Sequence, residues 1–230
     1  LPVGLLSLLK IASVEGERFT VEVLADVQMI EVDCLLARMR EELDQQFRLV
    51  QADSSMKIDS NRLTRYRFRH ILFQKYLYGQ LDAIERAEYH EGVGKAIEKR
   101  FAGGLEAISV PLAIHFELAR LYDKAIHYYE AAARHANRFS SYEDSINHYN
   151  KALSLLALKP ETQTRNKLEL DLLIGKSAPL MFICGFASDE VGINNDRMVT
   201  LLKLVSSDLN MFPLYHAISS YYMMCARYPI

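Results

Sequence analysis

Glycine and long apolar runs are both scarce in this sequence, and each scarcity argues against a class of protein. Only 10 of the 230 residues are glycine, below the usual share of about 7%, so a β-sandwich or barrel with many tight turns is not expected. The longest apolar runs, such as 178–187, reach about half the length of a membrane-spanning helix. We therefore expect no membrane protein and no contact with a membrane.

Cysteine is also scarce, with Cys34, Cys184 and Cys225 odd in number and far apart. They form neither a disulfide framework nor a CxxC metal motif, and no signal peptide is visible. This pattern predicts a cytoplasmic protein. Because residue 1 is leucine and a periodic segment reaches the last residues, we expect the chain to be a piece cut from a longer protein.

The overall composition is that of a folded protein. Half of the residues are hydrophobic and 24% are charged, and 27 basic against 29 acidic residues give a net charge of −2. At about 150 residues per domain, this length suits one large domain or two small ones.

The first 80 residues mix helical and strand patterns. Apolar residues at helical spacing predict a short buried helix over 5–12 and an amphipathic helix over 31–46, with a further segment between them that ends near Val27. Three helices followed by a two-stranded hairpin form the winged-helix pattern, so we predict a winged-helix domain at 1–80.

The predicted hairpin has one strand at 47–52 and a second at 65–70, joined by a polar loop at 53–61. On the second strand, Arg65, Arg67 and Arg69 share one face, while Tyr66, Phe68 and His70 share the other.

Beyond residue 80 every periodic stretch is helical. Ala87, His90, Val93, Ile97 and Phe101 share one face of a helix that is expected to stop at Gly103 and Gly104, and Pro111 is expected to open the next helix. Residues 122–132 (YDKAIHYYEAA) and 142–152 (YEDSINHYNKA) match in register, with tyrosine, isoleucine and alanine at the same positions. Further helices are expected over 162–176, 188–206 and 212–227. We predict an α-solenoid of tetratricopeptide type at 81–230, truncated at its C-terminus.

Sequence motifs for catalysis or metal binding are incomplete. Gly175-Lys176-Ser177 resembles the end of a P-loop, but Leu170 stands where the first glycine is needed and the segment is helical. His90-Glu91 lacks the second histidine of HExxH. The other histidines of the helical region are expected to be surface or core residues, namely His115, His127, His135, His148 and His216. We predict no catalytic residue and no metal site.

A winged-helix domain can bind DNA, so DNA binding is one candidate function of the predicted domain at 1–80. The presumed recognition helix, 31–46, holds five acidic residues against two arginines, and phosphates would repel it. The stretch 57–70 is basic and could form an aromatic ribbon for nucleic acid. The alternative, which we favour, is an edge strand with a solvated arginine face and aromatic residues in the core.

Several segments together resemble the C-terminal half of bacterial STAND-type signalling ATPases, often fused to class III adenylate or guanylate cyclase domains, to kinases or to transcriptional regulators. The likeness rests on 9–19 (LKIASVEGERF), 68–78 (FRHILFQKYLY), the HYYEAA and HYNKAL segments and the later MFPLYHAISSYY. It covers nearly the whole chain, and its most specific part is the FRH block.

The resemblance implies a nucleotide-sensing role for His70, with Arg69 beside it. In relatives of this family a winged-helix histidine contacts the β-phosphate of bound ADP, so ATP or ADP would bind to an upstream nucleotide-binding domain of the parent protein, not to this segment. Arg69 and Ile71 depart from the Met-His-Asp context found in those relatives. The alternative is a buried His70 bonded to a backbone carbonyl.

Three functions follow as hypotheses. The first is the regulatory arm of a STAND-type ATPase whose solenoid binds a protein partner or effector, the second a DNA-binding regulator, and the third a free-standing tetratricopeptide scaffold. Four tyrosines could line a peptide groove on the solenoid or could pack between its helices: Tyr128, Tyr129, Tyr142 and Tyr149.

Overall fold

The computed structural model of the chain describes residues 1–58, 61–101, 105, 108–205 and 211–225. Most of these residues are helical, and the sheet found among them is small and antiparallel, which confirms the mainly helical fold class. The chain divides into two compact units. The first comprises 1–105 with 114–121, and the second comprises 106–113 with 122–230.

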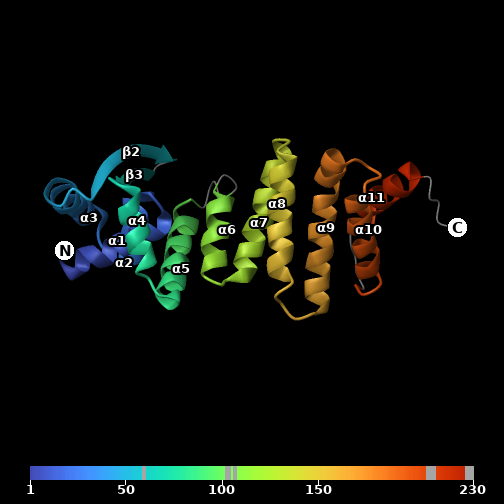
Figure 1. Cartoon of the computed structure of the whole chain (residues 1–230), viewed down its shortest axis with the longest axis horizontal. Helices are drawn as coiled ribbons and strands as arrows, with labels where there is room; N and C mark the ends of the chain where they lie inside the picture. Colours follow the sequence, from blue (N-terminus) through green and yellow to red (C-terminus); the bar gives the residue numbers. More distant parts are fainter. Residues whose placement is uncertain (59–60, 102–104, 106–107, 206–210, 226–230) are drawn as a thin grey trace. The chain divides into compact units, whose positions relative to one another are not determined.

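In its described residues, the first unit combines helices with three strands (Figure 1). Its elements are, in chain order, α1 (Val3–Glu15), β1 (Arg18–Thr20), α2 (Val21–Gln28), α3 (Val32–Arg38), η1 (Met39–Gln46), β2 (Val50–Ile58), β3 (Asn61–Phe68), α4 (Ile71–Gly79) and α5 (Ala83–Arg100). Helical segments therefore precede a hairpin, as expected. The short strand β1 had no counterpart in the expectation.

The strands form an antiparallel sheet in the order β1-β3-β2. Phe19 on β1 and Tyr66 and Phe68 on β3 are buried and their rings are in contact. The alternation predicted for the second strand is thus confirmed at its aromatic positions. His70 is not on this face, because the strand ends at Phe68 and His70 is exposed.

The expected loop at 53–61 is wrong, because β2 continues to Ile58 and β3 begins at Asn61. The segment is polar, which argued against a strand. However, β2 lies at the edge of the sheet and its residues 52–55 are exposed, so no apolar side chains are required there. The ladder with β3 supplies its backbone hydrogen bonds, with one irregularity between Ala52 and Ser54.

The amphipathic helix predicted over 31–46 is present but changes its geometry part-way. It begins as α3 and continues as the π-helix η1 from Met39. Leu35, Met39 and Leu43 are fully buried. Their spacing of four residues keeps all three on one face as the helix widens from an α-helical to a π-helical turn.

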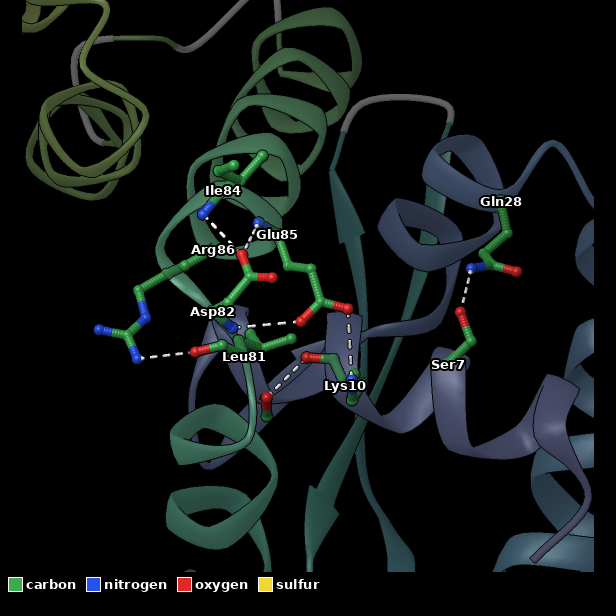
Figure 2. Close-up of polar contacts among 9 residues, drawn as sticks. Ser7, Lys10, Gln28, Leu81, Asp82, Ile84, Glu85 and Arg86 are labelled. Carbon is green, nitrogen blue, oxygen red and sulfur yellow. Dashed lines mark hydrogen bonds and ion pairs between the residues drawn. The ribbon is translucent and has the colours of Figure 1, made fainter.

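Helix α5 is tied to α1 at its first turn (Figure 2). The Asp82 carboxylate accepts hydrogen bonds from the backbone N–H groups of Ile84 (2.7 Å) and Glu85 (2.9 Å), and Glu85 accepts one from the backbone of Asp82 (3.2 Å), completing a capping box. The other carboxylate oxygen of Glu85 lies 3.4 Å from Nζ of Lys10 on α1. The cap therefore both starts the helix and orients it.

The compact units do not divide at residue 80, where the domain boundary was predicted. Helix α5 packs against α1 and α2 within the first unit. His90, Val93 and Ile97 are buried on its inner face, as the helical spacing predicted. The expected stop at Gly103 and Gly104 lies outside the described residues.

Among the described residues of the second unit, every regular element of secondary structure is a helix. It takes the start of α6 (Ser109–Leu118) and all of α7 (Tyr122–Arg138), α8 (Tyr142–Leu156), α9 (Gln163–Cys184), α10 (Asp189–Leu202) and α11 (Met211–Met224). Pro111 lies in the first turn of α6. Helices α7 to α10 stand side by side, each packed on the next (Figure 1). Matching repeat positions are buried at Tyr129 and Tyr149 and at Ala132 and Ala152.

Helix α9 is longer than its predicted range of 162–176. It continues to Cys184 although Pro179 lies inside it. Leu180 and Met181 are buried in the core between α9 and α10, and this burial offsets the backbone hydrogen bond that proline cannot donate. The ends predicted at 206 and 227 lie outside the described residues, and α10 already ends at Leu202.

Gly175 allows α9 to approach α8 closely. A Cβ added at this glycine would lie 2.7 Å from Cζ of Tyr149, whose side chain is buried. Because the tyrosine ring is enclosed, it cannot swing away at low cost. The absence of a side chain at residue 175 is therefore a packing requirement.

We predict that Gly175→Ala destabilises the chain and that Gly79→Ala does not. Overpacking against Tyr149 costs about 1–3 kcal/mol, whereas a Cβ at Gly79 meets nothing within 4 Å and should stabilise α4 by about 0.4–1 kcal/mol. Urea unfolding of both variants tests this pair. Equal stability changes for the two variants would contradict the packing argument.

Candidate functional site

His70 caps the N-terminus of α4. Its Nδ1 accepts a hydrogen bond from the backbone N–H of Leu72 (3.1 Å), and its side chain is exposed. Because Nδ1 is the acceptor, the proton of the neutral ring lies on Nε2. No described residue accepts a hydrogen bond from that Nε2–H group. The alternative of a buried His70 bonded to a carbonyl is therefore wrong.

The neighbouring Arg69 is already engaged with the sheet and with η1. Its Nε donates to the backbone oxygen of Val50 (3.0 Å), and its Nη2 donates to Oδ1 of Asp44 (2.5 Å). These contacts anchor the chain directly before α4. They hold His70 in place, and they leave the Arg69 guanidinium less available for a phosphate than a free arginine would be.

An apolar hollow of about 470 Å³ lies beside His70, between α1, α4 and the end of β3. The ring of Phe73 contacts that of His70, with centroids 6.3 Å apart. Leu72 and Tyr76 are 62% and 66% exposed, which is unusual for side chains of this size on a helix with an apolar face. The exposed imidazole therefore stands at the edge of an exposed apolar surface.

The four tyrosines proposed for a peptide groove do not form one. Tyr128, Tyr129 and Tyr149 are each at most 4% exposed, so they pack between helices. Tyr142 is half-buried and stacks on Phe182, with ring centroids 4.9 Å apart. The three buried rings fill the space between neighbouring helices, so they are not accessible to a peptide.

Three arginines face acidic side chains: one on β1, one on β3 and one directly after β3. Arg18 and Arg67 each lie 3.7 Å from a carboxylate oxygen of Asp53, and Arg69 is bonded to Asp44. An arginine that is paired with a carboxylate contributes less net positive charge for binding phosphates. The expectation that this strand does not bind DNA stays a prediction. The side chains of Lys57 and Arg62 lie outside the described residues.

The fragment of a P-loop motif lies inside α9, as its helical pattern predicted. Oγ of Ser177 donates to the backbone oxygen of Leu173 (2.9 Å), a bond within the helix. Among the described residues, no group of three or more histidine, cysteine or acidic side chains could hold a metal ion. No helix in the same part of the chain is long and apolar enough to cross a membrane.

A buried chain of polar side chains in the first unit was not predicted from the sequence. Nδ1 of His90 on α5 lies 2.9 Å from Nδ1 of His115 on α6, and Nε2 of His90 lies 3.0 Å from the hydroxyl of Tyr78 on α4. The two histidines are 3% and 6% exposed. The apolar spacing around His90 had placed it on the inner face of α5, but nothing in the sequence linked it to His115.

A second cavity, of about 300 Å³, lies in the second unit among α6, α7 and α8. Its wall includes His135 and His148, which were expected to be surface or core residues, together with Asp144. The spacing of Asp144 and His148, four residues apart on α8, is the sequence signal that could have suggested a shared site.

Comparisons with known proteins leave the family open. The chain matches no family model, no curated protein and no solved structure.

Proposed function

We propose that this chain is the regulatory and protein-interaction segment of a STAND-type signalling ATPase. In this proposal residues 1–80 form a winged-helix domain that senses the nucleotide state of an upstream domain, and the following helices form a tetratricopeptide-like solenoid that binds a partner or effector. The observation that carries the proposal is the exposed, oriented imidazole of His70 at the edge of an apolar surface.

The arrangement of elements supports the two finer assignments. Helix, strand, two helical segments and a hairpin follow one another in the first unit, and the sheet order β1-β3-β2 brings the first strand beside the hairpin. This is the pattern expected of a winged helix. The stacked helices α7 to α10, with a repeat in register between the first two, are the pattern expected of a solenoid.

The chemistry of His70 suits a contact with ADP. Its Nε2–H can donate to a phosphate oxygen, and a hydrogen bond to a charged group is worth about 1.5–3 kcal/mol. This is the size of a typical allosteric coupling energy, about 1–3 kcal/mol. The exposed Leu72, Phe73 and Tyr76 would supply the apolar surface against which the nucleotide-binding domain packs.

We predict that His70→Ala in the full-length protein speeds the loss of bound ADP by roughly ten- to a hundredfold, because one hydrogen bond to a charged phosphate is removed. The measurement is the release of a fluorescent ADP analogue after dilution into unlabelled nucleotide. The basal output activity of the parent should rise in the same variant.

Two further variants separate nucleotide sensing from helix capping. His70→Ser keeps an acceptor for the N-terminus of α4 but is too short to reach a phosphate, so it should behave like His70→Ala. His127→Ala, at an exposed position on α7, should behave like the unchanged protein. If His70→Ser retained ADP normally, His70 would be a cap and not a sensor.

The alternatives remain a DNA-binding regulator and a free-standing scaffold. A fluorescence anisotropy titration with duplex DNA at low salt would reveal the first. The coding sequence upstream of Leu1 distinguishes the free-standing scaffold from the ATPase segment. The ATPase requires a GxxxxGK[ST] loop there, whereas neither alternative does.

A further inference from the structure

The cavity of about 300 Å³ in the second unit is lined by polar and apolar side chains in comparable amounts, and we call it the polar pocket. Its polar and aromatic lining comes from the start of α6, the end of α7 with the residues just after it, and the start of α8: Ser109, His135, Phe139, Ser141, Asp144 and His148. All of these residues belong to one compact unit. The pocket therefore does not depend on how the two units are placed.

The carboxylate of Asp144 is the charged group of the polar pocket. It is exposed and makes no hydrogen bond or ion pair with lysine or arginine among the described residues. His148, one helical turn further on, is half-buried, and burial lowers the pKa of its imidazole more than the nearby Asp144 raises it. Asp144 is therefore the acidic side chain of the pocket lining, and no described lysine or arginine lines the pocket.

The remaining lining offers both hydrogen bonds and an apolar wall. The imidazoles of His135 and His148 and two serine hydroxyls can accept hydrogen bonds. Ala132, Ala136 and the ring of Phe139, which is 71% exposed, form the apolar part. An anion would meet the Asp144 carboxylate, whereas a cation on an aliphatic stem would find a counter-charge, acceptors and an aromatic face.

We propose that the polar pocket binds a primary ammonium group on an aliphatic stem, namely a lysine side chain of the protein partner. The ammonium lies at Asp144 between the two imidazoles, and the methylene groups lie against Ala132, Ala136 and Phe139. The identity of the ligand as part of a protein rests on the proposed role of the helical array in partner binding. The preference for an ammonium group rests on the pocket alone.

The test uses the whole 230-residue chain and small probes. The imidazole signals of His135 and His148 are followed by NMR while Nα-acetyl-lysine amide, Nα-acetyl-norleucine amide or Nα-acetyl-glutamate amide is added. We expect the lysine probe to shift both signals with a dissociation constant in the millimolar range, since an exposed ion pair contributes little. The norleucine and glutamate probes should bind at least about fivefold more weakly.

A matched pair of variants locates the charge that is responsible. Asp144→Asn should weaken the lysine probe about fivefold, whereas Glu143→Gln should not change its binding. Both residues lie in the first turn of α8 and both changes remove one negative charge, but only Asp144 lines the polar pocket. Preserved amide chemical shifts would show that both variants are folded.

Several results would overturn the inference. Equal binding of norleucine would make the pocket merely apolar, and stronger binding of glutamate or inorganic phosphate would make it an anion site. Equal effects of Asp144→Asn and Glu143→Gln on binding would show that Asp144 has no specific role. Imidazole chemical shifts that do not change on addition of the lysine probe would show that the pocket does not bind an ammonium group. None of these results bears on nucleotide sensing, which the His70 variants test separately.

Discussion

Lowering the pH from about 7 to about 4.5 is expected to destabilise the first unit by several kcal/mol, because two histidines are buried there without charge. His90 and His115 face each other through their Nδ1 atoms at 2.9 Å. One proton between the two nitrogens makes a hydrogen bond. When both rings are protonated, two N–H groups face each other with no acceptor between them.

The direction of the effect follows from the pKa values. Burial lowers the pKa of His90 to about 3, with further contributions from His115 and Arg86, and burial lowers the pKa of His115 to about 4. In the unfolded chain both histidines have pKa values near 6.5. Between this pH and the lower pKa values of the folded chain, the unfolded chain therefore binds more protons than the folded chain. The contribution of the pair is complete above pH 6.5 and is lost as the pH falls through about 4 for His115 and toward about 3 for His90.

The protonation of Glu15 partly offsets this loss of stability at low pH. Burial raises the pKa of its carboxyl to about 7, against the lowering effect of hydrogen bonds from the backbone and hydroxyl of Thr20. Between pH 4.5 and 7 the folded chain thus holds a proton that the unfolded chain releases, which favours the fold at the lower pH. Because two histidines act against one carboxyl, stability should still fall with falling pH.

Urea unfolding at several pH values between 4.5 and 7.5 measures the slope of stability against pH. Each histidine contributes up to about 1.4 kcal/mol per pH unit. The double variant His90→Leu/His115→Leu should flatten this slope, whatever its stability at pH 7. His127→Leu, at an exposed position on α7, should keep the slope. An unchanged slope in the double variant would show that the pair does not control acid stability.

Glu169→Gln is expected to cost the second unit about 3 kcal/mol, since it removes the buried one of the two carboxylates that pair with a nearly buried arginine. Glu169 on α9 receives two hydrogen bonds from Arg197 on α10, at 2.6 and 2.9 Å, and lies 3.3 Å from Nη1 of Arg165. The side chains of Glu169 and Arg165 are only 11% and 10% exposed. Arg197 is 41% exposed, so its loss of a partner adds less.

Glu161→Gln is the matched control for this prediction. Glu161 also pairs with Arg165, at 3.7 Å, but its side chain is 81% exposed. Water solvates that carboxylate in both the folded and the unfolded chain, so its removal should change stability by less than about 1 kcal/mol. Urea unfolding of the two variants at neutral pH makes the comparison. If both changes cost the same, burial is not what makes the network important.

Local patterns predicted much of the secondary structure correctly. The apolar spacing of α3 and η1, the alternation of Tyr66 and Phe68, and the repeat shared by α7 and α8 each depend on side chains near one another in sequence. The predictions failed where distant partners compensate for an unfavourable local sequence. The polar stretch of β2 is held by its ladder to β3, and α9 continues through Pro179 because Leu180 and Met181 are buried against α10.

For the candidate sites, too, local sequence suggested individual residues, whereas contacts between distant residues decided what those residues do. The resemblance of the FRH block singled out His70, but its exposure and its role as a helix cap depend on where β3 ends and α4 begins. The tyrosines shared by the repeat looked suitable for a groove until the packing of neighbouring helices enclosed three of them. The contact between His90 and His115, 25 residues apart, has no local pattern at all.

The sequence by itself determined the mainly helical class, the succession of most helices and the apolar faces that they bury, because helix and strand periodicity are properties of neighbouring residues. Only the tertiary structure decided which polar groups meet: the His90–His115 pair, the Glu169 network and the polar pocket. Each joins side chains from different helices, whose approach is set by the packing of whole apolar faces and not by the residues that finally touch.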